Sequence, residues 1–325
     1  MFGLQTFGNI YTRIGNPTCA VLEERVAALE GGTAGLAIAS GHAAQVIVMH
    51  ALMTPGDELV ASKKLYGGSI NQFNHSYKNF GWNVVWADPD DIASFEKAVT
   101  PKTKCIFIES IANPGGIIVD IEAISKIARK AGVPLVVDNT LATPYLCKPI
   151  DYGADIIVHS LTKFLGGHGN SIGGLIVDGG TFNWSRDKKY PMLSEPRPEY
   201  QGIILHETFG NFAFAIACRV LGLRDLGPAL SPFNAFLILT GVETLPLRMV
   251  WAGEISYSVY LLQAAGRNVA LFFVQHPALD ILLTCFFTTI IASASFILVE
   301  RPSRTFLRRL FTRWTGDHGK LRRPQ

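Results

Sequence analysis

Residues 134–163, PLVVDNTLATPYLCKPIDYGADIIVHSLTK, contain two short apolar runs that lead into polar residues. The first run, Leu135–Asp138, ends in a carboxylate, and the second, Asp155–His159, is followed by SLTK, which ends at Lys163. Apolar runs of this length predict buried strands. Ligands of parallel sheets bind beyond the C-terminal ends of the strands. Asp138 and Lys163 are therefore predicted to share a site.

The same pattern of short apolar runs continues in the sequence on both sides of this stretch. The sequence predicts further strands at Glu58–Ala61, Asn83–Ala87, Cys105–Glu109 and Gly174–Val177, and helices at Asp91–Val99 and Ile121–Ala131. We expect the second helix to end at Gly132 and Pro134. Strands that alternate with amphipathic helices predict an α/β fold, with a mainly parallel sheet covered by helices.

The motif Ser160-Leu161-Thr162-Lys163 favours a phosphorylated aldehyde cofactor. A lysine amine holds such a cofactor covalently, and the two hydroxyls can donate hydrogen bonds to its phosphate, which suits pyridoxal 5′-phosphate (PLP). The glycines that follow, at positions 166, 167 and 169, allow the backbone to turn tightly beside a bulky ligand. Alone the motif is weak, because a surface lysine after a strand is common.

Asp138 lies twenty-five residues before Lys163, at the end of PLVVDN. A carboxylate there can pair with a pyridine nitrogen and keep it protonated, which makes the ring an electron sink. The alternative is an ordinary strand-end or helix-capping aspartate. The later lysine favours the functional interpretation.

Three further motifs fit the same ligand. In ASGHAA (39–44), Gly41 and His42 begin an apolar helical run whose free N–H groups suit a phosphate. In LYGGS (65–69), the Tyr66 ring can lie on a pyridine ring or move protons, although a core tyrosine gives the same pattern. In ESIANP (109–114), the Asn113 amide can reach the ring hydroxyl or a substrate carboxylate, or simply form a turn before proline.

These motifs together carry a family resemblance. SGHAAQ, LYGGS, ESIANPGG, VVDNTLATPY and VHSLTKFLGGHGNSIGG, in this order, resemble the Cys/Met-metabolism PLP-dependent enzymes. Within that family they are most similar to the O-acetylhomoserine sulfhydrylases, and so is VLGLRDLGPALSPFNAFLILTGVETLPLRM. The resemblance extends from about Phe2 to Met249. It implies the fold-type-I large domain of PLP-dependent transferases.

The resemblance also implies a role for each matching residue. Lys163 forms the Schiff base, Asp138 pairs with the ring nitrogen, and Tyr66 stacks on the ring. The phosphate contacts implied are Ser160, Thr162, Gly41 and His42. Tyr11 and Arg13 match a pair that crosses to the neighbouring subunit's phosphate, which implies a homodimer or homotetramer.

The reaction implied is a γ-replacement by a transferase of methionine and cysteine biosynthesis. O-acetylhomoserine and sulfide give homocysteine and acetate, with Lys163, Tyr66 and Asp138 as the catalytic residues. Proton transfer requires groups with tuned pKa values, and Lys163 beside a cationic ring nitrogen is one. The family's C-terminal domain normally supplies an arginine for the substrate carboxylate, and the sequence offers no equivalent.

The chain changes character near residue 250. Residues 281–299 are nineteen uncharged, mostly apolar positions followed by a basic segment, and residues 255–275 form a weaker apolar run. The tail resembles the last two membrane helices of the integral-membrane acyltransferases. We therefore expect a fusion joined between Leu247 and Trp251, with a membrane contact through residues 255–299. A buried helix pair is the alternative.

Four segments are thus expected. They are an N-terminal arm (1–40), a PLP-binding large domain (41–205), the start of a truncated C-terminal domain (206–249) and a hydrophobic helical tail with a basic end (250–325). Loss of the C-terminal domain suggests a second functional hypothesis, a PLP-binding but catalytically impaired fusion protein with a membrane-associated tail.

Charge and cysteine usage limit the remaining possibilities. The net charge is +3, and eight Lys and Arg against one Asp fall in residues 301–325, so no general nucleic-acid surface is expected. The five cysteines are scattered without a CxxC pair, which predicts a reducing compartment with neither disulfides nor a metal site. The N-terminus lacks the pattern of a signal peptide. A cytoplasmic catalytic region follows.

Overall fold

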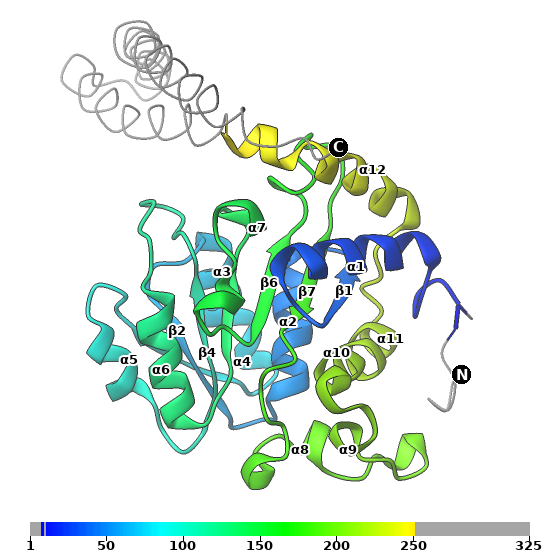
Figure 1. Ribbon diagram of the computed structural model, residues 1–325. Coiled ribbons are helices and arrows are strands. Elements are labelled where there is room, and N and C mark those ends of the chain that lie inside the picture. Colours follow the sequence, from blue (N-terminus) through cyan, green and yellow to red (C-terminus); the bar gives the residue numbers. More distant parts are fainter. Residues whose placement is uncertain (1–7, 10, 251–325) are drawn as a thin grey trace, which may run out of the picture. The chain divides into compact units, whose positions relative to one another are not determined.

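A seven-stranded sheet forms the centre of the computed structural model, which describes residues 8, 9 and 11–250 (Figure 1). The strands are β1 (Ala34–Ile38), β2 (Glu58–Ser62), β3 (Asn83–Ala87), β4 (Thr103–Glu109), β5 (Leu135–Asp138), β6 (Ile156–Ser160) and β7 (Gly174–Asp178). Their order is β1-β7-β6-β5-β4-β2-β3. Strands β3, β2, β4, β5 and β6 pair in parallel, and β7 is antiparallel to both of its neighbours. The predicted mainly parallel α/β sheet is confirmed.

Helices connect and cover the strands. The α-helices are α1 (Pro17–Glu30), α2 (Gly41–Leu52), α3 (Gly67–Asn71), α4 (Tyr77–Asn79), α5 (Ile92–Ala98), α6 (Ile121–Ala131), α7 (Thr143–Leu146), α8 (Pro191–Ser194), α9 (Leu205–Phe209), α10 (Ala213–Ala217), α11 (Arg224–Leu226) and α12 (Pro232–Glu243). Short 3-10 segments are η2 (Pro149–Tyr152), η3 (Arg186–Lys188), η4 (Pro198–Tyr200) and η5 (Gly210–Phe212). Two π-helical segments are η1 (Gln72–Ser76) and η6 (Cys218–Leu223).

The six strands predicted from sequence all form, with ends that shift by at most two residues. Strand β6 begins and ends one residue later than expected, so Ser160 is its last residue. Helix α6 has the predicted bounds, and Gly132 ends it in the left-handed conformation with φ 65°. This conformation favours glycine because it has no Cβ.

Strand β1 was not predicted from the sequence. Its residues, AGLAI, are mostly small and have weak strand propensity. The strand forms because it pairs antiparallel with β7, about 140 positions later in the chain, in the register Ala34↔Asp178 to Ile38↔Gly174. Gly35 also lets α1 approach, because a Cβ there would lie 2.4 Å from the Glu23 carbonyl oxygen. A long-range contact therefore decides this strand.

The two faces of the sheet have different partners. Helix α2 packs on β6 and β7, whereas α6 packs on β5. Since side chains alternate along a strand, Val136 and Asp138 point to one face and Val137 and Asn139 to the other. Val136 belongs to the apolar cluster that includes the buried residues of α2. Asp138 therefore lies on the face that α2 covers.

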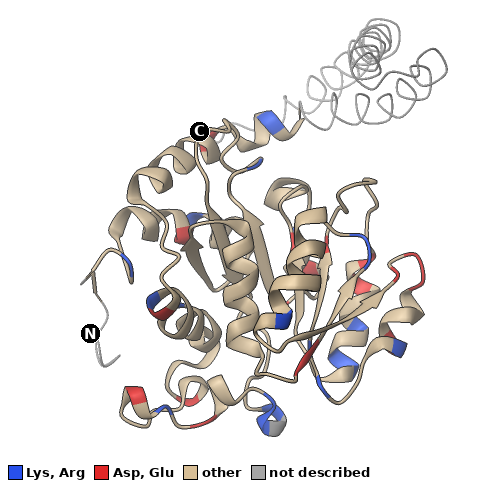
Figure 2. Cartoon of the chain, turned by 180° about the vertical axis from the view of Figure 1, so that it is seen from behind, with Lys and Arg blue, Asp and Glu red and all other residues tan. Residues whose placement is uncertain are grey.

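Residues Met1–Pro246 form one compact unit, and Leu247–Gln325 form a second unit of which the structure describes only residues 247–250. The expected apolar tail, the membrane contact through 255–299 and the basic end lie outside the described residues. Within residues 8, 9 and 11–250, no helix combines the length and apolar character needed to cross a bilayer. The Lys, Arg, Asp and Glu residues of the described part fall mostly on loops and outer helices (Figure 2).

Candidate active site

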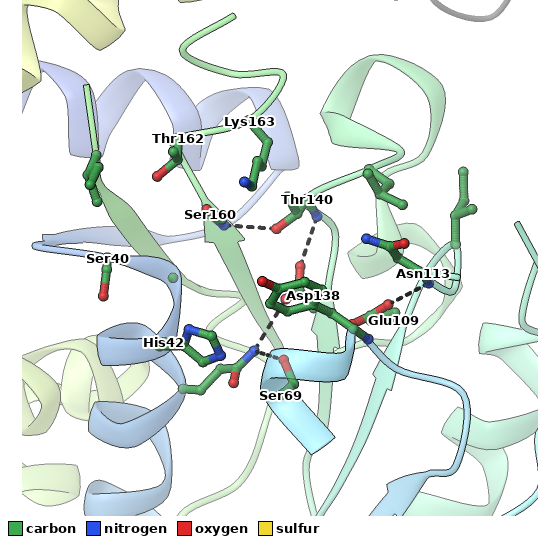
Figure 3. A pocket seen from close by; sticks show the side chains of 16 residues that line it. Ser40, His42, Ser69, Glu109, Asn113, Asp138, Thr140, Ser160, Thr162 and Lys163 are labelled. Atoms are coloured by element: carbon green, nitrogen blue, oxygen red, sulfur yellow. Dashed lines mark hydrogen bonds between the residues drawn. The ribbon is translucent and has the colours of Figure 1, made fainter. Parts of the chain in front are cut away.

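A cavity of about 430 Å³ opens where β4, β5 and β6 end (Figure 3). It is lined by Ser40, Gly41, His42, Gln45, Tyr66, Ser69, Glu109, Ile111, Asn113, Asp138, Thr140, Leu141, Ser160, Thr162, Lys163 and Ile172. Its volume is in the usual range for a small-molecule site. Eight of the ten residues predicted from sequence therefore lie around one cavity, at the strand ends where ligands of parallel sheets bind.

Asp138 is the last residue of β5 and is surrounded by protein atoms apart from the cavity. Oδ1 accepts a hydrogen bond of 3.0 Å from the Thr140 backbone N–H, and Oδ2 accepts one of 3.4 Å from Gln45 Nε2. Burial raises the pKa of the carboxyl above its ordinary value, although these hydrogen bonds oppose the rise. A cation in the cavity would oppose the effect of burial and lower the pKa of this carboxyl group. Asp138 is thus suited to pair with a positively charged ring.

Lys163 follows β6 and shares the cavity with Asp138 (Figure 3). Its backbone N–H donates to the Ser160 carbonyl over 3.3 Å, which forms a turn directly after the strand. Gly167 and Gly169, with φ 76° and 65°, continue this turn in the left-handed region, as the glycine pattern predicted. The turn places the Lys163 side chain over the C-terminal end of the sheet.

Ser160 and Thr162 line the same part of the cavity. The Ser160 backbone N–H donates to Thr140 Oγ1 over 2.8 Å, which ties the end of β6 to the loop after β5. Thr162 Oγ1 accepts from the Gly173 N–H at 3.3 Å. These hydrogen bonds fix the backbone of Ser160 and the hydroxyl of Thr162, so both hydroxyls are held beside Lys163.

Helix α2 begins at the cavity. Ser40 caps the helix, because its Oγ accepts from the Ala43 N–H over 3.1 Å. No hydrogen bond of the described residues occupies the N–H groups of Gly41 and His42. Glycine is required at 41, since a Cβ there would lie 2.8 Å from Ser160 Cβ. The free amides and the helix dipole favour an anion here.

Tyr66 lies at the start of α3 and is half exposed toward the cavity. Its ring centroid is 5.9 Å from that of His42. Glycine at 68 makes room for it, because a Cβ there would lie 2.4 Å from Tyr66 Cε1. The ring thus has an open side on which a flat ligand can stack.

Tyr11 and Arg13 do not line this cavity. Arg13 instead donates through Nη1 to the Arg224 carbonyl, and its guanidinium lies 5.3 Å from the centroid of the exposed Tyr11 ring. The two residues expected to act at a neighbouring subunit therefore lie apart from the site of their own chain.

Among the lining residues that received no role from the sequence, three hold other site residues by hydrogen bonds. Gln45 on α2 bridges Ser69 Oγ, at 3.0 Å, and Asp138. Thr140 forms hydrogen bonds with both Asp138 and Ser160. Glu109 accepts hydrogen bonds from backbone N–H groups of two loops. A glutamine within the apolar helix GHAAQVIVMHAL was a usable signal for Gln45. The other two require knowledge of which strands are neighbours.

The residues present fit PLP. His42 Nε2 and Gln45 Oε1 are buried at the cavity wall without a hydrogen-bond partner among the described residues. Buried polar atoms of this kind favour a polar ligand, since leaving them unpaired costs free energy. One end of the cavity offers helix amides and hydroxyls for a phosphate, and the other offers Asp138 for a ring nitrogen. Lys163 supplies the amine.

Comparisons with known proteins identify the family of this chain. The sequence profile of the Cys/Met metabolism PLP-dependent enzyme family matches residues 1–280, which is past Met249, where we expected the resemblance to end. An O-acetyl-L-homoserine sulfhydrylase of Leptospira meyeri is 53% identical over 257 residues, covering 77% of this chain and 58% of that protein. A homocysteine/cysteine synthase of Saccharomyces cerevisiae is 49% identical over 256 residues, covering 78% and 58%. The chain thus spans less than two thirds of the length of these relatives.

A solved structure shows the same fold. The putative O-acetylhomoserine (thiol)-lyase of Campylobacter jejuni superposes with a TM-score of 0.77 at 40% identity, over 85% of this chain and 66% of that one. It contains an N'-pyridoxyl-lysine-5'-monophosphate residue. The chain described here has the fold of PLP-dependent transferases of fold type I and belongs to the Cys/Met metabolism PLP-dependent enzyme family.

Proposed function

We propose that this chain carries the PLP site of an O-acetylhomoserine sulfhydrylase, which converts O-acetylhomoserine and sulfide into homocysteine and acetate by γ-replacement. The observation that carries the proposal is the shared cavity of Lys163 and Asp138 at the ends of β6 and β5. Relatives whose sequences are about half identical to this chain are named for this activity.

Each residue then has a task. Lys163 holds the cofactor covalently, and its amine, once displaced by the substrate, takes the proton from Cα. When bound, PLP supplies an electron sink for negative charge at the substrate carbon. Asp138 keeps a negative charge opposite the ring nitrogen. Tyr66 stacks on the ring and is placed to move protons during loss of acetate from Cγ.

The phosphate end is assigned on the same basis. Gly41 and His42 contribute their backbone N–H groups, and Ser160 and Thr162 their hydroxyls. Asn113 lines the cavity near Glu109 and can reach the ring hydroxyl or the substrate carboxylate. The cavity lining contains one cationic side chain, Lys163, among the described residues. An arginine for the substrate carboxylate is therefore not assigned.

The test has two stages. Purified protein mixed with PLP is expected to become yellow, and borohydride is expected to fix the cofactor on the peptide that contains Lys163. The homocysteine formed from O-acetylhomoserine and sulfide is then measured. Absence of the adduct would refute the whole proposal. An adduct without homocysteine formation would instead favour the PLP-binding but catalytically impaired protein.

We also propose that the active form is a homodimer or homotetramer in which Tyr11 and Arg13 reach the neighbouring subunit's phosphate. Their position away from the cavity of their own chain supports this assignment. Sedimentation of the PLP-bound protein tests it, since a monomer that binds PLP at full affinity would contradict it. We also propose that the domain boundaries lie at residues 40, 205 and 249.

A cytoplasmic catalytic region with a membrane-associated tail is proposed from sequence. The four cysteines in the part of the chain that the structure describes are unpaired, which fits a reducing compartment. Fractionation of cells tests the tail. We expect the full chain in the membrane fraction, and we expect Ile290→Asp to release it, because a charge within 281–299 opposes insertion. A wild-type chain found in the soluble fraction would contradict the membrane contact.

A further inference from the structure

Glu109 uses its two carboxylate oxygens to hold two different loops. It is the last residue of β4, and only 4% of its surface is exposed. Oε1 accepts from the Tyr66 N–H over 2.6 Å. Oε2 accepts from the Asn113 N–H over 3.0 Å (Figure 3). Tyr66 belongs to the segment after β2, whereas Asn113 belongs to the loop after β4. One side chain thus bridges segments that are 47 positions apart.

Both loops carry residues of the cavity wall. Tyr66 and Asn113 line the cavity together with Glu109. The Tyr66 side chain is half exposed, so its ring position depends in part on where its backbone is fixed. Tyr66 has no side-chain cap for α3, and the carboxylate of Glu109 is the partner of its N–H. Loss of this acceptor would free the segment that carries the ring.

Glu109 also lies beside Asp138. The two are register partners on the parallel strands β4 and β5, so their side chains point to the same face of the sheet. Burial and the neighbouring Asp138 raise the pKa of Glu109 to about 8, while the N–H groups of Tyr66 and Asn113 lower it. The other titratable groups that line the cavity are His42, Tyr66 and Lys163. Both oxygens of this buried carboxyl group accept from backbone N–H groups of the two loops.

We propose that Glu109 is a positioning residue, which clamps the loops of Tyr66 and Asn113 against the bound cofactor through two backbone N–H groups. The inference rests on the proposed cofactor site. Glu109 itself touches neither the cofactor nor the substrate in this assignment. It acts through the two residues whose backbones it holds.

The variant Glu109→Gln tests the clamp. Glutamine offers a single oxygen, and its NH₂ group faces the second N–H, so one loop loses its acceptor while the shape is kept. We expect the affinity for PLP to fall roughly tenfold, the scale of one buried hydrogen bond lost. We also expect a changed near-ultraviolet circular dichroism spectrum of the ligand-free protein, because the Tyr66 segment is released.

Asp178→Asn is the matched control. Asp178 is a second buried carboxylate that accepts two backbone N–H groups, those of Gly180 at 2.9 Å and Ala215 at 3.1 Å. None of these residues lines the cavity. We expect its PLP affinity to stay within about twofold of wild type. A Glu109→Gln protein with unchanged affinity, or an equal loss in Asp178→Asn, overturns the proposal.

Hydrogen exchange of the ligand-free wild-type protein gives a test that needs no variant. The amides of Tyr66 and Asn113 are expected to be protected, and exchange at the rate of an unstructured peptide overturns the clamp. This readout also separates the two proposals. If the wild type fails to bind PLP, the proposed function falls, while protection of the two amides is measured independently of any cofactor.

Discussion

Glu30 and His159 meet in the interior, with Glu30 Oε1 2.6 Å from His159 Nε2 and both side chains fully buried. Glu30 ends α1, and His159 precedes Ser160 on β6. Asn139 Nδ2 donates to the same Glu30 oxygen over 2.8 Å, and its Oδ1 accepts from Ser110 Oγ over 2.8 Å. These residues are chain neighbours of Asp138, Ser160 and Glu109, on the opposite face of the sheet. The network therefore connects α1 to the strands that carry the site.

Glu30→Ala is expected to destabilise the protein strongly. It leaves His159 Nε2 without its partner and removes one of the two acceptors of Asn139 Nδ2. Removal of one partner of a buried pair costs about 3–5 kcal/mol. The free energy of unfolding in urea measures this loss. Glu96→Ala, which removes an exposed pair with Lys130, is the control and is expected to leave stability unchanged. Equal effects of the two variants would exclude a structural role for the buried network.

Lys163→Ala is expected to abolish the yellow adduct and the activity, because it removes the amine that we propose bonds to the cofactor. Visible absorption and the mass after borohydride reduction are the measurements. Lys126→Ala is the control, since Lys126 is an exposed lysine of α6 that pairs with Glu122. Persistent activity in Lys163→Ala would show that the site is assigned wrongly.

Asp138→Asn is expected to weaken PLP binding by roughly 10- to 100-fold, the range for a hydrogen bond between charged groups. The amide keeps the size of the side chain but removes the charge that, in our proposal, faces the ring nitrogen. Fluorescence titration of the ligand-free protein with PLP measures the affinity. Unaltered binding would mean that the carboxylate does not contact the ring.

The ligand-free protein is expected to lose stability as the pH rises from about 4 to 8. Burial raises the pKa of Asp178 to about 7 and that of Glu109 to about 8, so the unfolded chain releases these protons first and is favoured as pH increases. For Asp178 the effect is on the order of 4 kcal/mol across this window. Urea unfolding at several pH values measures the slope, and Asp178→Asn should flatten it. A wild-type protein that becomes more stable between pH 5 and 8 would contradict this assignment.

Much of the candidate site could be predicted from local sequence. The apolar strands end at Asp138 and just before Lys163, and parallel strands bring their C-terminal ends to one edge of a sheet. Ser40, Gly41 and the glycines after Lys163 also carry local signals, since capping and left-handed φ angles depend on a few adjacent residues. These elements could therefore be predicted before any tertiary contact was known.

Other features of the fold and the site depend on which strands are neighbours, and only the tertiary structure decides this. The five small residues of β1 have no strong strand signal and pair with a strand about 140 positions away. The contacts of Glu109 with Tyr66 and of Glu30 with His159 join residues 43 and 129 positions apart. Sequence periodicity reports how each segment divides into buried and exposed faces, whereas partners across a sheet are selected by the packing of the whole chain. Eight of the ten residues predicted to act chemically thus line one cavity, whereas the residues that hold them in place were found only in the folded protein.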